Sequence, residues 1–173
     1  MITDSTLSVR AIYSLCSIEQ LKEETMQHNV LIPNLMVENV ADTVRYYQDI
    51  LGFELQIAMQ HQEDSQPNMV MELTDDMQLE WANMVSAGAE FMFQERHSLI
   101  EDIPALEGAS IGASQTIYIT LDEDIDQHYT ALKDKVEVVV EPVSKFYGMR
   151  EWYMKDCNGY ILGFAQSLNP AGE

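Results

Sequence analysis

The fold is decided by the stretch FYGMREWYMKDCNGYILGFAQ, residues 146–166. Two runs rich in strand-forming residues flank Cys157-Asn158-Gly159-Tyr160, and Asn-Gly is a strong hairpin signal because both residues tolerate positive φ. The stretch therefore predicts two antiparallel strands joined by a tight turn. Gly163 is unexpected, since a glycine inside a strand loses packing and marks a bulge or the close approach of another group.

The rest of the chain, taken together with this hairpin, shows the same order of elements twice. A strand (29–37), a helix (39–52) and a strand (53–60) precede a hairpin across Ala87-Gly88. A strand (116–122), a helix (123–134), a strand and the closing hairpin then follow. Each half is a βαβββ unit, and one such unit leaves a sheet face uncovered, so the two must combine.

Domain boundaries follow from this repeat. We expect an N-terminal appendage, partly helical, over 1–28, a main domain over 29–166 and a C-terminal tail over 167–173. Within the main domain, module one covers about 29–96 and module two about 115–166, and residues 97–114 form a linker.

Composition limits the function classes. The chain has 173 residues and a formal net charge of −20, from 9 Lys and Arg against 29 Asp and Glu. Such a charge repels nucleic acids and anionic membranes, so neither is expected as a partner. Cys16 and Cys157 are expected to be free thiols of a cytoplasmic protein, because no secretory signal precedes them.

The two segments IPNLMVENVADTVRYYQDILGFEL and GMREWYMKDCNGYILGFAQ resemble the opening and closing elements of the vicinal oxygen chelate (VOC) superfamily. This superfamily comprises glyoxalase I, bleomycin-resistance proteins and extradiol dioxygenases. The resemblance covers residues 29–166, and Cys157 departs from it where the family usually has proline. It implies an α+β fold in which two βαβββ modules form a cupped eight-stranded mixed sheet with helices outside.

Enzymes of this superfamily hold a divalent metal with one His or Glu from each of four strands. By resemblance those positions fall here on Ile32, Met92, Thr116 and Gly163, none of which supplies an imidazole or a carboxylate. We therefore expect no metal site, no cofactor and no catalytic residue. The histidines His28, His61, His97 and His128 are interpreted as surface residues.

Strand alternation separates a core face from a cup face. The core face is expected to carry Leu31, Pro33, Leu35, Val37, Phe91, Phe93, Ile117, Ile119, Leu121, Leu162 and Phe164. The opposite face is expected to line a small-molecule pocket whose floor at Gly163 is bare backbone. The expected ligand-binding residues are Asn34, Trp81, Glu90, Met92, Gln94, Tyr118, Tyr147, Trp152 and Gly163.

Tyr147-Gly148 followed by Arg150-Glu151-Trp152 resembles the drug-groove pattern of the bleomycin-resistance branch. The sequence thus favours a metal-free homodimer that sequesters a cationic or aromatic compound, as in antibiotic resistance. Two alternatives stay open. One is a lyase, isomerase or dioxygenase of this superfamily with a non-standard metal site, and the other is an interaction module whose cup is filled.

Overall fold

The computed structural model describes residues 30–60, 68–112 and 114–169. The chain divides into two units, Met1–Leu31 and Ile32–Glu173, and the second unit contains both βαβββ modules. The predicted N-terminal appendage, with His28 and Cys16, lies outside the described residues, as does His61. In the part described, no helix is long and apolar enough to cross a membrane.

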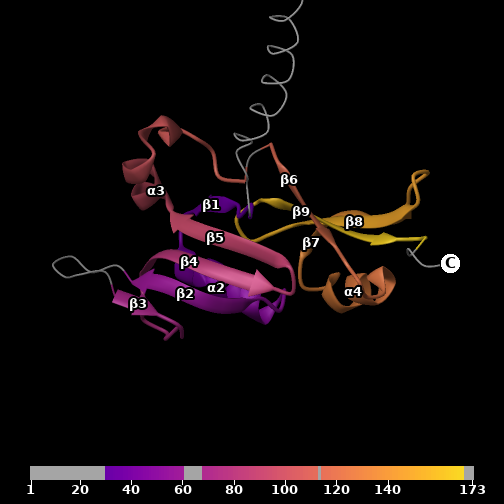
Figure 1. Cartoon of the computed structure of the whole chain (residues 1–173), viewed down its shortest axis with the longest axis horizontal. Coiled ribbons are helices and arrows are strands. Elements are labelled where there is room, and N and C mark those ends of the chain that lie inside the picture. Colours follow the sequence, from indigo (N-terminus) through magenta and orange to yellow (C-terminus); the bar gives the residue numbers. More distant parts are fainter. Residues whose placement is uncertain (1–29, 61–67, 113, 170–173) are drawn as a thin grey trace, which may run out of the picture. The chain divides into compact units, whose positions relative to one another are not determined.

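Module one is a mixed five-stranded sheet with one long helix on it (Figure 1). Its elements are β1 (Asn34–Val37), α2 (Val40–Asp49), β2 (Glu54–Gln60), β3 (Asn68–Val70), β4 (Leu79–Ser86) and β5 (Ala89–Glu95). The strand order is β1-β5-β4-β2-β3, with β1 parallel to β5 and the other pairs antiparallel.

Module two repeats this arrangement with four strands. Its elements are β6 (Thr116–Thr120), α4 (Ile125–Leu132), β7 (Glu137–Ser144), β8 (Met149–Lys155) and β9 (Ile161–Ser167). The order β6-β9-β8-β7 matches β1-β5-β4-β2, and β6 is parallel to β9 as β1 is to β5. The α+β fold class and the βαβββ repeat are confirmed. The strands form two separately hydrogen-bonded sheets, and β3 adds a strand in a segment where the sequence pattern is ambiguous.

Two boundaries differ from the sequence prediction. The first strand is shorter than 29–37, because β1 begins only at Asn34, and Leu31 lies before it and outside the core. The expected linker contains the helix α3 (Arg96–Asp102) and the 3-10 turn η2 (Pro104–Leu106). Glu95 caps α3 by accepting hydrogen bonds from the backbone N–H groups of His97 and Ser98.

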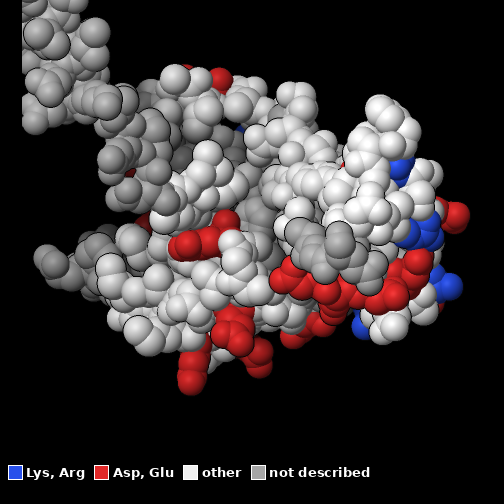
Figure 2. All heavy atoms as spheres, turned by 45° about the vertical axis from the view of Figure 1, so that its right-hand side comes forward, with Lys and Arg blue, Asp and Glu red and all other residues white. Residues whose placement is uncertain are grey.

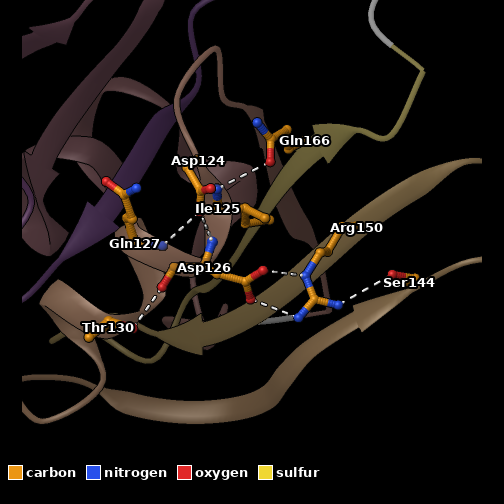
Figure 3. A network of polar contacts seen from close by, with 8 residues as sticks. All are labelled: Asp124, Ile125, Asp126, Gln127, Thr130, Ser144, Arg150 and Gln166. Carbon is orange, nitrogen blue, oxygen red and sulfur yellow. Dashed lines mark hydrogen bonds and ion pairs between the residues drawn. The ribbon is translucent and has the colours of Figure 1, made fainter.

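The two long helices begin at capping side chains. Asn39 Oδ1 accepts from Asp42 N at 3.0 Å, and Asp124 Oδ1 accepts from Asp126 N and Gln127 N at 2.9 Å each. Helix α4 is further fixed to its sheet by Arg150 on β8, which forms two hydrogen bonds to Asp126 at 2.7 and 2.9 Å (Figure 3). These contacts hold the start of each helix in place.

The core lies between each sheet and its helix. Tyr47 of α2 packs against Phe91 and Phe93, with ring centroids 5.9 and 4.6 Å away. In module two Trp152 stacks on Phe164 at 5.0 Å. The predicted core face is confirmed for Leu35, Val37, Phe91, Phe93, Leu162 and Phe164, all of which are buried.

The closing hairpin also joins the two modules. Gly159 in its turn has φ +86°, whereas Asn158 keeps a negative φ, so only the glycine uses the left-handed region that the Asn-Gly pair offered. Asp156 Oδ1 accepts from Asn158 N and Tyr160 N, and its other oxygen accepts from Tyr47 OH at 2.8 Å. The turn is therefore held against α2 of module one by a buried carboxylate.

Candidate functional site

Each sheet has one face under its helix and one face directed away from it. The face directed away from the helix is called the module-one face in the sheet of module one and the module-two face in the sheet of module two. The cross-strand pairs place Asn34, Met36, Trp81, Asn83, Glu90, Met92 and Gln94 on the module-one face. They place Tyr118, Glu151, Tyr153, Gly163 and Ala165 on the module-two face.

The module-one face carries amide and carboxylate side chains that bind one another. Asn34 donates to Gln94 at 2.8 Å, and Gln94 in turn donates to Asp102 of α3 at 2.7 Å. Asn83 donates to Glu90 at 2.8 Å. Five predicted site residues thus share this face: Asn34, Trp81, Glu90, Met92 and Gln94.

The module-two face is centred on a buried carboxylate. Glu151 is 1% exposed, and its two oxygens accept hydrogen bonds from three phenol hydroxyls. Tyr118 and Tyr147 donate to Oε1 at 2.7 and 2.9 Å, and Tyr153 donates to Oε2 at 2.9 Å. We call these four residues the Glu151 cluster. Such charge-assisted hydrogen bonds are among the strong ones in proteins.

The electrostatics of the Glu151 cluster favour an ionised carboxylate. Burial raises the pKa of Glu151, but the hydrogen bonds from the three tyrosines outweigh burial, so its pKa lies below the ordinary value. Burial and the bond to Glu151 together raise the pKa of Tyr153 to about 12 and that of Tyr118 further still. At neutral pH the cluster is therefore a carboxylate surrounded by neutral phenols.

Gly163 lies beneath this cluster. In the sheet it pairs with Tyr118 on β6 and with Tyr153 on β8. A Cβ at this position would lie 2.6 Å from Tyr153 Cε1 and 3.4 Å from Tyr118 Cδ2. The expected bare pocket floor is therefore wrong, because the ring of Tyr153 covers it.

Trp152 does not belong to either face. Its side chain is 0% exposed and packs between Phe164 and helix α4, because it alternates with Glu151 and Tyr153 along β8. Tyr147 does reach the module-two face, from the turn before β8. The nine predicted residues thus fall into two groups, one on each sheet, with Trp152 in the core.

His128 is also placed differently from its sequence interpretation. Its ring centroid lies 4.6 Å from that of Phe164 and 5.6 Å from that of Trp152, so it packs at the interface between α4 and its sheet. Its Nδ1 is buried without a hydrogen-bond partner among the residues described. Burial lowers the pKa of His128, against the opposing effect of Glu123.

The predicted ligand-binding residues do not include Glu151 or Tyr153, although Glu151 lies in the Arg150-Glu151-Trp152 motif and the aromatic Tyr153 follows it directly. Strand parity finds them once the register of the β8–β9 pair is known from the structure: Glu151 faces Ala165 and Tyr153 faces Gly163. Once Gly163 is assigned to the cup face, its direct partners on the neighbouring strand must lie there too.

The four positions that resemble metal ligands do not fit a metal. Met92 pairs with Asn34, and Gly163 occupies the equivalent place opposite Tyr118. The four residues offer a thioether, a methyl group, a hydroxyl and a bare Cα. These groups do not form a set of donors for a hard or borderline divalent ion. Across residues 30–60, 68–112 and 114–169, no group of three or more His, Cys, Asp or Glu residues is arranged to hold one.

Two cavities lie elsewhere on the molecule. One of about 430 Å³ is lined by residues that include Glu38, Glu95 and Glu101, and one of about 390 Å³ by residues that include Asp42 and Cys157. Neither is lined by a predicted site residue. The thiol of Cys157 is free, as expected, and the residue is exposed.

Comparison with known proteins agrees with this architecture. Residues 26–164 match the family model described as Glyoxalase/Bleomycin resistance protein/Dioxygenase superfamily. A glyoxalase/bleomycin resistance protein/dioxygenase from Nocardioides superimposes with a TM-score of 0.64 at 14% identity, covering 92% of this chain and 98% of that one.

A superfamily member from Sphaerobacter thermophilus superimposes with a TM-score of 0.58 at 21% identity, covering 83% of this chain and 100% of that one. No curated protein matches the chain. At these identities the solved structures show a shared fold, and the family model extends over most of the sequence. The chain belongs to the glyoxalase/bleomycin resistance protein/dioxygenase superfamily.

Proposed function

We propose that this protein binds a small molecule and sequesters it without chemical change, in the manner of the bleomycin-resistance branch of its superfamily. The observation that carries the proposal is the Glu151 cluster. It places an ionised carboxylate and three aromatic rings on a sheet face directed away from helix α4. Polar groups concentrated among aromatic surfaces are typical of small-molecule sites.

Binding without metal-dependent catalysis is supported by the donor chemistry. The superfamily's metal positions fall on Ile32, Met92, Thr116 and Gly163, and Tyr153 covers the last of these. The proposed ligand-contacting residues are Tyr118 and Tyr147 with Glu151 and Tyr153, and the module-one residues Asn34, Trp81, Glu90, Met92 and Gln94. A homodimer is part of the proposal, because both faces are directed away from the long helix of their own module.

The proposal is tested by a thermal-shift screen of the full chain against cationic antibiotics and aromatic metabolites. A ligand present at about 100 times its Kd stabilises the folded protein by roughly 2.7 kcal/mol, which shifts the melting temperature measurably. A screen in which no compound raises the melting temperature would contradict the binding function and favour a filled, non-binding face.

Metal analysis after mild purification separates binding from the enzymatic alternative. We expect no stoichiometric Mn, Fe, Ni or Zn, because the described residues offer no suitable donor group. One equivalent of such a metal per chain would instead identify a lyase, isomerase or dioxygenase with ligands outside the family positions.

A further inference from the structure

We infer that the module-two face recognises an organic ammonium cation, held over the rings of the Glu151 cluster. This inference rests on the proposed function and decides between its two ligand classes, cationic and neutral aromatic. Three observations carry it: the charge of Glu151, the placement of the tyrosines and the hydrogen bonds that the carboxylate oxygens already accept.

The first observation is a buried negative charge that has no ion pair within the described ranges. Four of the described basic groups pair with other carboxylates: Arg45 with Asp42, Arg96 with Glu38, Arg150 with Asp126 and Lys155 with Glu137. Lys145 acts on Glu151 electrostatically, but more weakly than any of the three hydroxyls. A buried carboxylate whose hydrogen-bond donors are neutral hydroxyls, and which forms no ion pair with a described basic group, attracts a cation strongly, because few water dipoles screen it.

The second observation is the aromatic surface around that charge. Tyr118 is 46% exposed and Tyr147 is 54% exposed, and the fully exposed Phe146 lies edge-to-face with Tyr147 at 5.0 Å. A phenol hydroxyl that donates a hydrogen bond to an anion increases the electron density of its ring, which strengthens the attraction of a cation to the ring face. Cations are attracted to aromatic rings within about 6 Å of the centroid.

The third observation selects the kind of cation. Three of the roughly four acceptor positions of the Glu151 carboxylate already take phenol hydrogen bonds, so at most one is left for a metal ion unless tyrosines are displaced. A methylated ammonium needs no lone pair, since it is bound through charge and ring faces. The Glu151 cluster therefore fits an ammonium group better than a metal ion.

The test compares choline with its neutral carbon isostere, 3,3-dimethylbutan-1-ol, by ligand-observed NMR titration of the full chain. We expect choline to bind at least tenfold more tightly than the alcohol. Equal affinities, or no binding of choline, would overturn the inference. If the inference fails in this way but neutral aromatic compounds raise the melting temperature in the thermal-shift screen, the proposed binding function still holds. If no compound raises the melting temperature, both the inference and the proposed function are contradicted.

Glu151→Gln locates the site. It removes the charge and keeps the shape, so choline affinity should fall at least tenfold while affinity for the alcohol stays the same. Glu141→Gln is the matched control, because it removes an exposed carboxylate from β7 of the same sheet. If Glu151→Gln does not fold, Tyr147→Leu removes an exposed ring and should weaken choline binding. Unchanged choline affinity in a folded variant would place the cation elsewhere and refute the inference.

Discussion

At the scale of single residues, Gly163 and the ring of Tyr153 pack closely on the module-two face. The ring lies where a side chain at residue 163 would project, and its hydroxyl is bound to Glu151. The glycine therefore positions a tyrosine, and through that tyrosine it orients one hydrogen bond of the Glu151 cluster.

Gly163→Ala should disturb this arrangement. Its Cβ would lie 2.6 Å from Tyr153 Cε1, so the ring must move, and the bond between the Tyr153 hydroxyl and Glu151 is strained or lost. We expect a loss of about 1–3 kcal/mol in the free energy of unfolding, measured by urea denaturation. Gly88→Ala is the control, because a Cβ there meets nothing within 4 Å. Equal stability of the two variants would show that the ring moves freely.

The sequence predicts that Gly163 is a special position, because strand interiors disfavour glycine. It does not reveal the neighbour, since that depends on the register between β8 and β9. The same limit applies to Trp152. Neighbouring residues along β8 point to opposite faces of the sheet, and the surrounding motif does not show whether Trp152 points to the core or to the module-two face.

At the scale of elements, helix α4 depends on contacts of two kinds. Its first turn is fixed by the Asp124 cap and by the Asp126–Arg150 pair (Figure 3). Its packing side includes His128, which lies against Phe164 and Trp152. The polar contacts of the first turn are exposed to water and salt. The packing against Phe164 and Trp152 depends on His128 staying neutral.

We predict that acidification weakens this packing. The pKa of His128 is lowered from its ordinary value of 6.5 in the folded protein, so below that pH the unfolded chain binds the proton more readily. The stabilisation is complete above pH 6.5 and is lost as the pH falls towards the folded pKa. Denaturation at several pH values should show this loss in the wild type, and His128→Phe should remove that part of the pH dependence. An unchanged profile in His128→Phe would contradict the assignment.

The two faces of a strand should differ in their tolerance of truncation. Phe93→Ala and Phe164→Ala each remove a buried ring, and we expect each to cost about 3–5 kcal/mol in the free energy of unfolding. Met92→Ala alters a half-buried side chain on the module-one face and should cost clearly less. Chemical denaturation of the three variants checks this, and equal losses would show that the face assignment is wrong.

Most elements could be predicted because their signals are local. The apolar spacing and caps of α2 and α4 and the turn residues of both hairpins lie within a few positions of each other. Helix α3 was missed because only Leu99 is buried in it, so its sequence lacks an apolar stripe. The start of β1 depends on its partner β5, which is distant in sequence.

At the scale of the whole molecule, the closing turn joins the modules through three polar contacts. Tyr47 OH donates to Asp156, Asn158 donates to Thr43 Oγ1, and Tyr160 OH donates to the backbone oxygen of Met36. All three cross from module two to module one. They could not be predicted from sequence because each joins residues more than 100 positions apart.

Tyr47→Phe tests this junction. It leaves one oxygen of the buried Asp156 without its phenol donor, which should cost about 1–3 kcal/mol in the free energy of unfolding. The matched control is Tyr46→Phe, whose hydroxyl makes no hydrogen bond to a described residue. We expect a single shifted transition by circular dichroism. A loss no larger than that of Tyr46→Phe would show that the Tyr47 bond contributes little to the junction.

The acidic surface also belongs to this scale. Figure 2 shows Asp and Glu side chains forming a band on the visible face, with most Lys and Arg at one edge. At long range this field favours the approach of cations, and the effect weakens with added salt. The distribution supports attraction of a positively charged ligand before any contact with the Glu151 cluster is made.

In both modules the first strand is hydrogen-bonded to the last, and each sheet is built entirely from strands of its own module. A change on one sheet face therefore leaves the hydrogen-bonding partners of the other sheet unaltered. The two modules can then carry different side chains on their faces, a network of amides on one and tyrosines around a carboxylate on the other. The side chains on the two faces can therefore change one module at a time.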